Sequence, residues 1–342
     1  MICHTLMMMA LPTKAPDARP ASVGSVDSTV RPVRCHWARD EHAYLCDEVL
    51  EGVEAAWTAQ VDGLGWPEPI LDDDGILDVY VSSEGGGGAY AYGPPEDADP
   101  SDGRMGTAAH IVIDPSFAVD TWIYWTMLHE FNHVLQYSID FTETRYLAWE
   151  GISTAVEWWS DRSLWPMDVY IEDFQSQPWV GLLGDGWMLD RDYRILSLYD
   201  YGGALWAFHL DNRTGDGAGG AALDLWLNNA QEGWDNEPDF IDALGMAFDT
   251  WAEGVLDFAV SRISVGTSNT PAWASQYSDA KFGIRLEDSV TAADLPTSVT
   301  PEFMPLQTGA VYAELTGVAS GERVRIAADG DPSVNWAVFG YQ

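Results

Sequence analysis

Apolar residues in the first third of the chain predict one amphipathic helix and two strands. The helix spans about 41–62, where four apolar residues recur along one face: Leu45, Val49, Val53 and Ala56. The runs ILDVYV at 76–81 and TAAHIVID at 107–114 are rich in β-branched residues and predict strands. Between them, 83–103 is dense in Gly, Pro and Asp, so we expect a long loop outside the core.

The rest of the chain has a mostly helical pattern. We expect helices at about 120–137, 149–162, 200–213, 219–231, 237–247 and 249–263. Asp120 is a suitable N-cap for the first of these helices, and a Trp-rich irregular segment at 165–195 separates the second from the third. From about residue 300 the residues alternate as in strands, which predicts a small β module or an incomplete sandwich at 300–342.

The charge balance narrows the possible partners. The chain has 54 Asp and Glu residues against 16 Lys and Arg residues, and its formal net charge is −38. This balance argues against nucleic acid and anionic lipid as partners, because both require a cationic surface. No apolar stretch approaches the roughly 18 residues of a membrane-spanning helix, so we expect no membrane insertion.

The N-terminal segment and the cysteines favour a secreted or extracellular protein. Residues 1–32 start with an apolar run that lacks a positively charged beginning, and then become rich in Pro, Ala, Ser and Val. We expect them to be leader and linker, either a signal-peptide remnant from bacterial-type export or a disordered tail. Cys35 and Cys46 can close a small loop through a disulfide in an oxidising compartment. Cys3 would then remain unpaired or be removed with a leader.

The segment HEFNH, residues 129–133, carries the clearest candidate chemistry. On a helix, His129 and His133 lie one turn apart on the same side, so both imidazoles can reach one metal ion. Glu130 lies beside them, where it can accept a proton from a metal-activated water. The alternative is an ordinary helix with polar residues on one face, since two histidines do not complete a zinc site.

A catalytic zinc ion usually takes a third protein ligand. Position 136 is Gln and position 139 is Ile, which excludes a third histidine of the metzincin type, and the next histidine is His209. The acidic candidates downstream are Asp140, Glu143, Glu150 and Glu157. Glu150 opens a predicted helix, and Gly151 removes side-chain bulk where two helices would cross. Glu157 lies two turns further along the same face, so one of these two glutamates can be a ligand and the other can hold a ligating histidine.

The combination of HEFNH, a 17-residue step to WEGISTAVE and a later Tyr-rich helix resembles the gluzincin metallopeptidases. Residues 70–215 carry this resemblance, which also extends to uncharacterised metalloproteases secreted by bacteria. It implies that His129, His133 and Glu150 bind Zn²⁺ and that Glu130 is the general base. Glu157 matches a second glutamate in the M1-type aminopeptidase branch.

The resemblance also implies a fold and a domain organisation. We expect an α+β chain with a zincin-like catalytic domain at 33–290, followed by the short β module. The catalytic domain would contain a small mixed sheet with an edge strand, an active-site helix and a mostly helical C-terminal lobe. The strand at 107–114 would be the edge strand beside the active site, where an extended substrate can add by main-chain hydrogen bonds.

Two tyrosines are candidates for stabilising the oxyanion of a tetrahedral intermediate. Tyr199 and Tyr201 precede a Gly-Gly pair and an apolar helix, and the Tyr-x-x-Gly spacing of the aminopeptidase branch points to Tyr199. The alternative is that both are packing aromatics. The aminopeptidases also mark the upstream strand with a glutamate, which 104–114 lacks, and this favours an endopeptidase.

Two further features have less specific patterns. The acidic stretch at 72–78 resembles a short calcium loop and makes Asp72, Asp74 and Asp78 candidate Ca²⁺ ligands, although an acidic turn before a strand is the simpler interpretation. His110 on the strand at 107–114 is expected to be a packed residue rather than a ligand.

The sequence thus predicts a zinc metallopeptidase that hydrolyses peptide or protein substrates with a zinc-activated water and Glu130 as general base. Two alternatives remain open. One is an extracellular or cell-surface binding protein that keeps the fold without turnover, and the other is a zinc hydrolase acting on bonds other than peptides. Retention of Glu130 argues against the first alternative.

Overall fold

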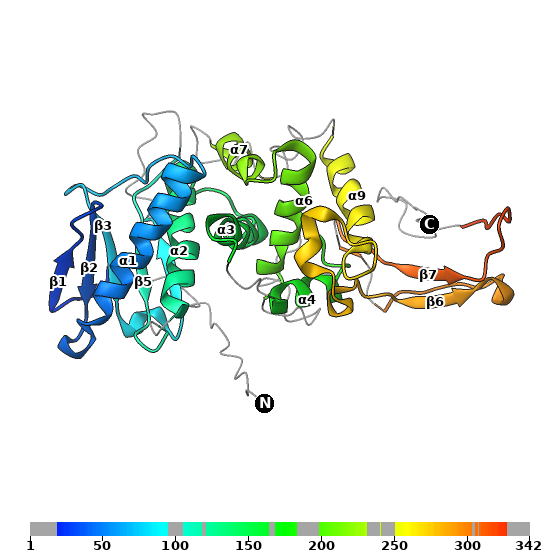
Figure 1. Cartoon of the computed structure of the whole chain (residues 1–342), viewed down its shortest axis with the longest axis horizontal. Coiled ribbons are helices and arrows are strands. Elements are labelled where there is room, and N and C mark those ends of the chain that lie inside the picture. The colour runs from blue at the N-terminus through cyan, green and yellow to red at the C-terminus, as the bar shows by residue number, and fades with distance from the viewer. Residues whose placement is uncertain are drawn as a thin grey trace.

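A five-stranded sheet with two helices forms one end of the molecule, further helices fill the middle, and a thin two-stranded ribbon projects from the other end (Figure 1). The chain is therefore α+β, as expected. This computed structural model describes residues 19–94, 105–117, 121–163, 168–182, 198–230, 240, 250–302, 305–306 and 308–326. The start of the expected leader, the expected cap Asp120, most of 237–247 and the chain after 326 lie outside the described residues.

The larger sheet is mixed, with the strand order β1-β2-β3-β5-β4. Its strands are Gly24–Asp27 (β1), Val33–Trp37 (β2), Leu77–Val81 (β3), Ala89–Tyr92 (β4) and His110–Ile113 (β5). The three central strands β2, β3 and β5 run parallel, while β1 and β4 pair antiparallel at the two edges. The helices α1 and α2 lie along one face of this sheet (Figure 1).

Alternation along the strands separates a core face from an outer face. Leu77, Val79 and Val81 of β3 are buried in the main core with α1 and α2. On the opposite face, Tyr80 packs with tyrosines of β4 and with Val112 of β5 in a smaller cluster. The alternation thus orients the sheet so that its apolar face supports the two helices.

The two helices on the sheet match the two longest patterns of the first half of the chain. Leu45–Trp57 (α1) continues into a π-helical turn, Thr58–Gly63, and Thr121–Ile139 is α2. A Cβ at Gly52 of α1 would lie 2.9 Å from the Met127 side chain, so glycine permits the close approach of the two helices. A disulfide joins Cys35 of β2 to Cys46 in the first turn of α1, which confirms the expected pairing.

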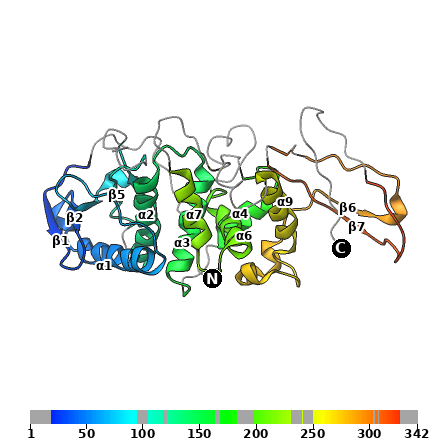
Figure 2. The ribbon, with the colours of Figure 1, turned by 90° about the horizontal axis from the view of Figure 1, so that it is seen from above.

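Helices dominate the remainder of the described chain (Figure 2). They include Tyr146–Ser160 (α3), Asp168–Ser176 (α4), the 3-10 turn Tyr201–Gly203 (η6), Ala204–Thr214 (α6), Gly220–Asn229 (α7) and Trp251–Ser261 (α9). A Cβ at Gly151 of α3 would lie 2.8 Å from the carbonyl carbon of Gly203, so Gly151 does mark a crossing of two segments. This crossing brings η6 against α3, which matters for the position of Tyr201.

The structure differs from the sequence expectations at short strands. β1 lies within the stretch expected to be linker, and β4 lies within the 83–103 stretch expected to be loop, with Tyr90 only 7% exposed. β5 is not the edge strand, because β4 pairs on its outer side. Both missed strands are four residues long and depend on distant partners, such as Gly24 with Trp37 and Ala89 with Ile113.

The C-terminal part of the described chain also differs in detail. α4 forms within 165–195, which was expected to be irregular. The ribbon consists of Asp288–Thr291 (β6) and Ala313–Thr316 (β7), which pair in parallel, so its first strand precedes the expected boundary at 300. Within the expected β module, the described residues after β7, 317–326, form no strand.

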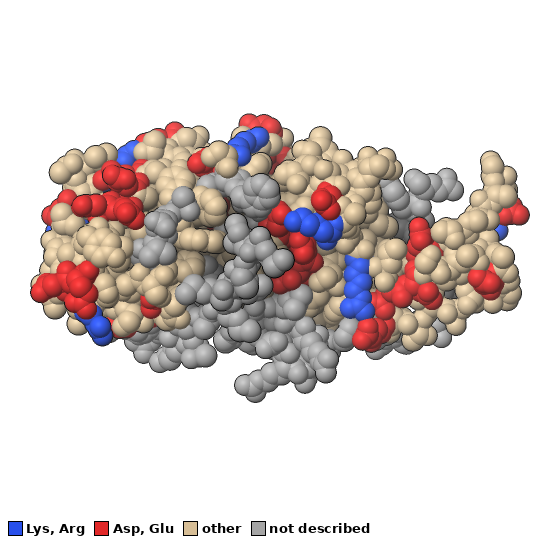
Figure 3. Space-filling model, turned by 60° about the horizontal axis from the view of Figure 1, so that its bottom comes forward, with Lys and Arg blue, Asp and Glu red and all other residues tan. Residues whose placement is uncertain are grey.

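Acidic side chains form patches on the molecular face shown in Figure 3, with few Lys and Arg residues between them. None of the described helices combines the length and the apolar character that crossing a membrane requires. The expected lack of affinity for nucleic acid stays a prediction.

His110 of β5 lies buried near Tyr80, on the opposite side of the sheet from α1 and α2. Its ring is 2% exposed and lies edge-on to Tyr80 and Tyr92, so it is a packed residue as expected. Neither ring nitrogen has a hydrogen-bond partner. Burial, together with the charge of Arg19, lowers the pKa of His110 to about 4, against a smaller opposite effect of Asp78.

The His110 imidazole binds a proton near its ordinary pKa of about 6.5 in the unfolded chain, but only near pH 4 in the folded chain. Acidification between these two values therefore favours unfolding. We expect His110→Phe to reduce the loss of unfolding free energy between about pH 7 and about pH 4.5 by roughly 2–3 kcal/mol. Urea unfolding at the two pH values measures this loss. An equal loss in variant and wild type would contradict the account.

Candidate metal centre

HEFNH lies on α2, with His129 and His133 facing α3. His129, Glu130 and His133 are each less than 9% exposed, and α3 presents Glu150 and Glu157 toward them with similar burial. The spacing of four residues places both imidazoles on one side of α2, as the sequence predicts. Five ionisable side chains are thus buried between two helices.

Three ligand atoms converge at this interface. His129 Nε2 lies 3.0 Å from His133 Nε2 and 3.1 Å from Glu150 Oε2, and His133 Nε2 lies 3.5 Å from Glu150 Oε2. Bonds of about 2.0–2.1 Å to a tetrahedral zinc ion place neighbouring ligand atoms about 3.3–3.4 Å apart. The triangle therefore has a size that could hold a metal ion, and Glu150, not Glu157, is its third member.

The remaining ring nitrogens are held by other side chains. His129 Nδ1 is 2.5 Å from Glu157 Oε1, so Glu157 takes the supporting role that the sequence suggests. His133 Nδ1 is 2.7 Å from Gln136 Oε1, a partner that the sequence reasoning missed although Gln136 lies one turn along the same helix. With both Nδ1 atoms engaged, both Nε2 atoms face the shared point.

Burial and charge act in opposite directions on these groups. Burial works to raise the pKa of Glu150, but the charge of His133 and the hydrogen bonds of both imidazoles hold that pKa below its usual value. Burial works to lower the pKa of His129, but Glu157 and Glu150 raise it well above the usual value. For Glu130 burial prevails and raises its pKa, which moves this carboxylate toward the range of a general base.

Glu130 faces a small cavity beside the ligand triangle. Its Oε2 atom is buried and has no hydrogen-bond partner, which is costly unless a water or an ion satisfies it. The cavity has a volume of about 30 Å³, enough for about two water molecules. Its walls are mainly aromatic: Phe117, Trp122, Trp125, Tyr170 and Tyr201.

The two candidate tyrosines lie in different places. Tyr201 lines the cavity and its ring stacks on His129, with centroids 5.5 Å apart. Tyr199 is fully buried, packs on Phe174, and donates its hydroxyl hydrogen bond to the carbonyl oxygen of Gly181 at 3.0 Å. The structure therefore favours Tyr201 over Tyr199, in contrast to the Tyr-x-x-Gly spacing.

A third tyrosine joins this wall. Tyr170 of α4 lies 4.9 Å from Tyr201 between ring centroids, and burial raises the pKa of both phenols, which keeps them protonated. The sequence reasoning missed Tyr170 because it lies in the segment expected to be irregular. The apolar spacing of Tyr170, Ile171 and Phe174 was the available signal for a short helix.

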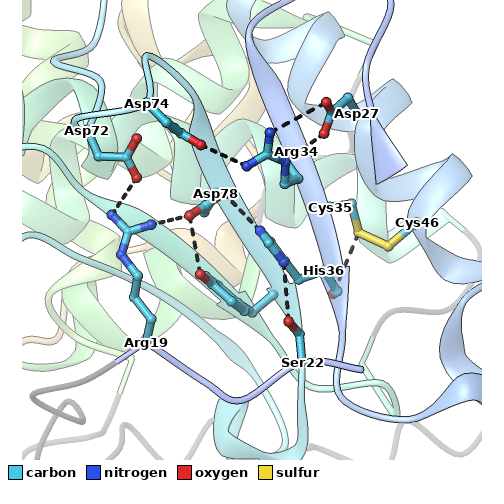
Figure 4. Close-up of polar contacts among 11 residues, drawn as sticks. Arg19, Ser22, Asp27, Arg34, Cys35, His36, Cys46, Asp72, Asp74 and Asp78 are labelled. Atoms are coloured by element: carbon cyan, nitrogen blue, oxygen red, sulfur yellow. Dashed lines mark hydrogen bonds and ion pairs between the residues drawn. A yellow bond between two sulfur atoms is a disulfide. The ribbon is translucent and has the colours of Figure 1, made fainter. Parts of the chain in front are cut away.

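The three aspartates proposed for calcium face arginines instead (Figure 4). Arg19 forms ion pairs with Asp72 and Asp78, and Arg34 pairs with Asp74. Asp78 also contacts His36. Within the part of the chain that the structure describes, metal-ligating side chains converge only at His129, His133 and Glu150, so the aspartates do not form a comparable cluster.

Comparison with known proteins adds no family assignment. No protein-family model matches the chain, and no curated protein matches it significantly. The interpretation of the site therefore rests on its geometry and on the sequence motif.

Metal binding should depend on the two glutamates to different degrees. We expect the protein to bind one zinc ion, Glu150→Gln to weaken binding severely because a ligand charge is lost, and Glu157→Gln to weaken it only about 10- to 100-fold. Competition with a zinc-chelating dye measures the three affinities. The reverse order of the two variants would make Glu157 the ligand.

Proposed function

We propose that the protein is a secreted zinc-dependent metallopeptidase, with His129, His133 and Glu150 as metal ligands and Glu130 as general base. The observation that carries the proposal is the convergence of three ligand atoms next to a buried, unsatisfied Glu130 carboxylate. Two imidazoles and a carboxylate are a donor set that suits catalytic zinc, with a fourth position left for water or substrate.

The chain's own residues supply the remaining chemistry. A bound zinc ion would polarise the substrate carbonyl and acidify water. Glu130 accepts a proton from the attacking water and passes it to the leaving amine. The phenol of Tyr201, which burial keeps protonated, donates a hydrogen bond to the developing oxyanion. The aromatic rings around the cavity exclude bulk water and favour apolar substrate side chains.

The sheet favours cleavage within a chain over removal of its N-terminal residue. β4 is the edge strand nearest to β5, and its sequence AYAY contains no carboxylate to bind a free amino group. Among the described residues no further strand pairs with β4 on its outer side, so this edge can offer main-chain hydrogen bonds to an extended peptide. A small mixed sheet, a helix that carries HEFNH and a mostly helical second half are features that the gluzincin resemblance implies, and they support a zincin-like fold.

Two features support the proposed extracellular location. The disulfide between Cys35 and Cys46 is of a kind that persists in oxidising compartments. The strongly acidic composition keeps a secreted protein soluble by mutual repulsion of its molecules.

Replacement of the general base tests the mechanism. We expect Glu130→Gln to lower kcat for peptide cleavage by about 10²–10⁴-fold because the amide cannot accept the proton. The variant should still bind one zinc ion, since Glu130 is outside the ligand triangle. Digestion of a peptide library, read by mass spectrometry, together with metal analysis checks both statements. Wild-type cleavage by the variant would remove the mechanism, and hydrolysis of esters or amides alone would point to another zinc hydrolase.

The two tyrosines form a matched pair for a second test. We expect Tyr201→Phe to lower kcat about 10²–10³-fold with little change in KM, because it removes a donor to the oxyanion. Tyr199→Phe removes a hydroxyl of the same kind whose partner is Gly181, so its kcat should stay close to wild type. Steady-state kinetics on one peptide substrate decides between them. A large loss of kcat in Tyr199→Phe alone would reverse the assignment.

A further inference from the structure

A buried polar network joins His133 to residues far along the chain. Gln60, Asn132, Gln136 and Ser153 are each 0% exposed and are linked by hydrogen bonds. Gln60 lies in the π-helical turn after α1, and such wide turns within helices are frequent at functional sites. The network has two branches, and both end on His133 Nδ1.

The first branch starts at a backbone carbonyl, which can only accept a hydrogen bond. The Leu128 carbonyl accepts from Gln60 Nε2 at 2.7 Å, so the Gln60 side-chain oxygen must face Asn132. Asn132 Nδ2 donates to that oxygen at 3.2 Å, which turns Asn132 Oδ1 toward the Ser153 hydroxyl. The Ser153 hydroxyl has a single proton, and two amide oxygens are placed to accept it: Asn132 Oδ1 at 3.0 Å and Gln136 Oε1 at 3.1 Å.

Ser153 Oγ then has only lone pairs left for His133. Its Oγ atom is 3.1 Å from His133 Nδ1, so the hydrogen on that contact must come from the ring nitrogen. Whichever of the two amide oxygens accepts the Ser153 proton, the first branch places a proton on His133 Nδ1.

The second branch gives the same result independently. The Trp149 carbonyl accepts from Gln136 Nε2 at 3.3 Å, so the Gln136 side-chain oxygen faces His133. That oxygen is 2.7 Å from His133 Nδ1 and can only accept, so Nδ1 again must donate. A neutral imidazole with its proton on Nδ1 has its lone pair on Nε2.

We propose that Gln136 and Ser153, oriented by the Trp149 carbonyl and by the chain through Asn132 to Gln60, are positioning residues that fix His133 in the Nδ1–H tautomer. This tautomer directs the Nε2 lone pair toward His129 Nε2 and Glu150. The inference rests on the metal centre of the proposed function and deepens it. The two histidines then differ in the partner of Nδ1. His129 Nδ1 contacts the carboxylate of Glu157, whereas His133 Nδ1 contacts neutral groups.

The tautomer can be read without a metal ion. We expect two-bond ¹⁵N–¹H correlation spectra of the metal-free wild type at mildly alkaline pH to show His133 protonated at Nδ1. The double variant Gln136→Met/Ser153→Ala removes both acceptors and should contain a substantial Nε2–H population. A wild-type His133 protonated at Nε2 would overturn the proposal.

Zinc affinity provides the second readout. We expect the double variant to bind zinc about 10- to 100-fold more weakly than wild type, and Gln136→Glu, which keeps an acceptor oxygen, to retain wild-type affinity or exceed it. The matched control is Thr154→Val, since Thr154 neighbours Ser153 on α3 and its buried hydroxyl has no hydrogen-bond partner. Equal affinities of the double variant and the Thr154 control would contradict the proposal.

The outcome is separable from that of the proposed function. A wild type with the Nδ1–H tautomer and this order of zinc affinities, but without peptidase activity, would support the positioning role and remove the peptidase. If the double variant fails to fold, Gln136→Glu still decides the test. A loss of zinc affinity in Gln136→Glu would overturn the proposal.

Discussion

Three carboxylates and two imidazoles are buried where α2 and α3 meet. These ionisable groups need charge and hydrogen-bond partners, and the surrounding residues supply them. Burying an ionised group without a partner costs several kcal/mol, so such a cluster persists only when each member has a partner or a bound ion. Glu157 compensates His129, and Glu150 compensates both histidines. Glu130 lines the cavity and keeps one buried oxygen without a partner.

The scaffold around the cluster is built to hold these side chains at fixed positions. The sheet supports α2 from one side through its apolar face, and α1 packs against α2 where Gly52 permits close contact. On the other side, Gly151 lets η6 approach α3, which places Tyr201 against His129. The buried amides behind His133 add a polar layer that a purely apolar core would not provide. Rigid placement of this kind is what a site requires when its reacting groups must be aligned before the substrate arrives.

Much of the fold and of the candidate site could be predicted from the sequence. The features that could not be predicted depend on contacts between residues far apart in the chain. α2 and α3 are long and have a clear helical period, so the two histidines could be placed on one helix and Glu150 on a second one from spacing. That Glu150 joins the histidines was implied by the gluzincin resemblance. The strands β1 and β4 are short and are defined by pairing with distant residues, which no local pattern reveals. Tyr199 and Tyr201 are only two residues apart, and the 3-10 turn directly before α6 begins at Tyr201, the one of the two that lines the cavity. Gln60 is 72 residues from Asn132, so its role depends on tertiary packing.

The location of a bound zinc ion tests the central claim most directly. Crystals of the zinc-loaded protein, measured on both sides of the zinc absorption edge, would show the ion as an anomalous difference peak. The structure predicts one peak at bonding distance from His129 Nε2, His133 Nε2 and Glu150 Oε2, with Glu130 close by but outside the ligand set. A peak held by other residues, or no peak between α2 and α3, would contradict the account.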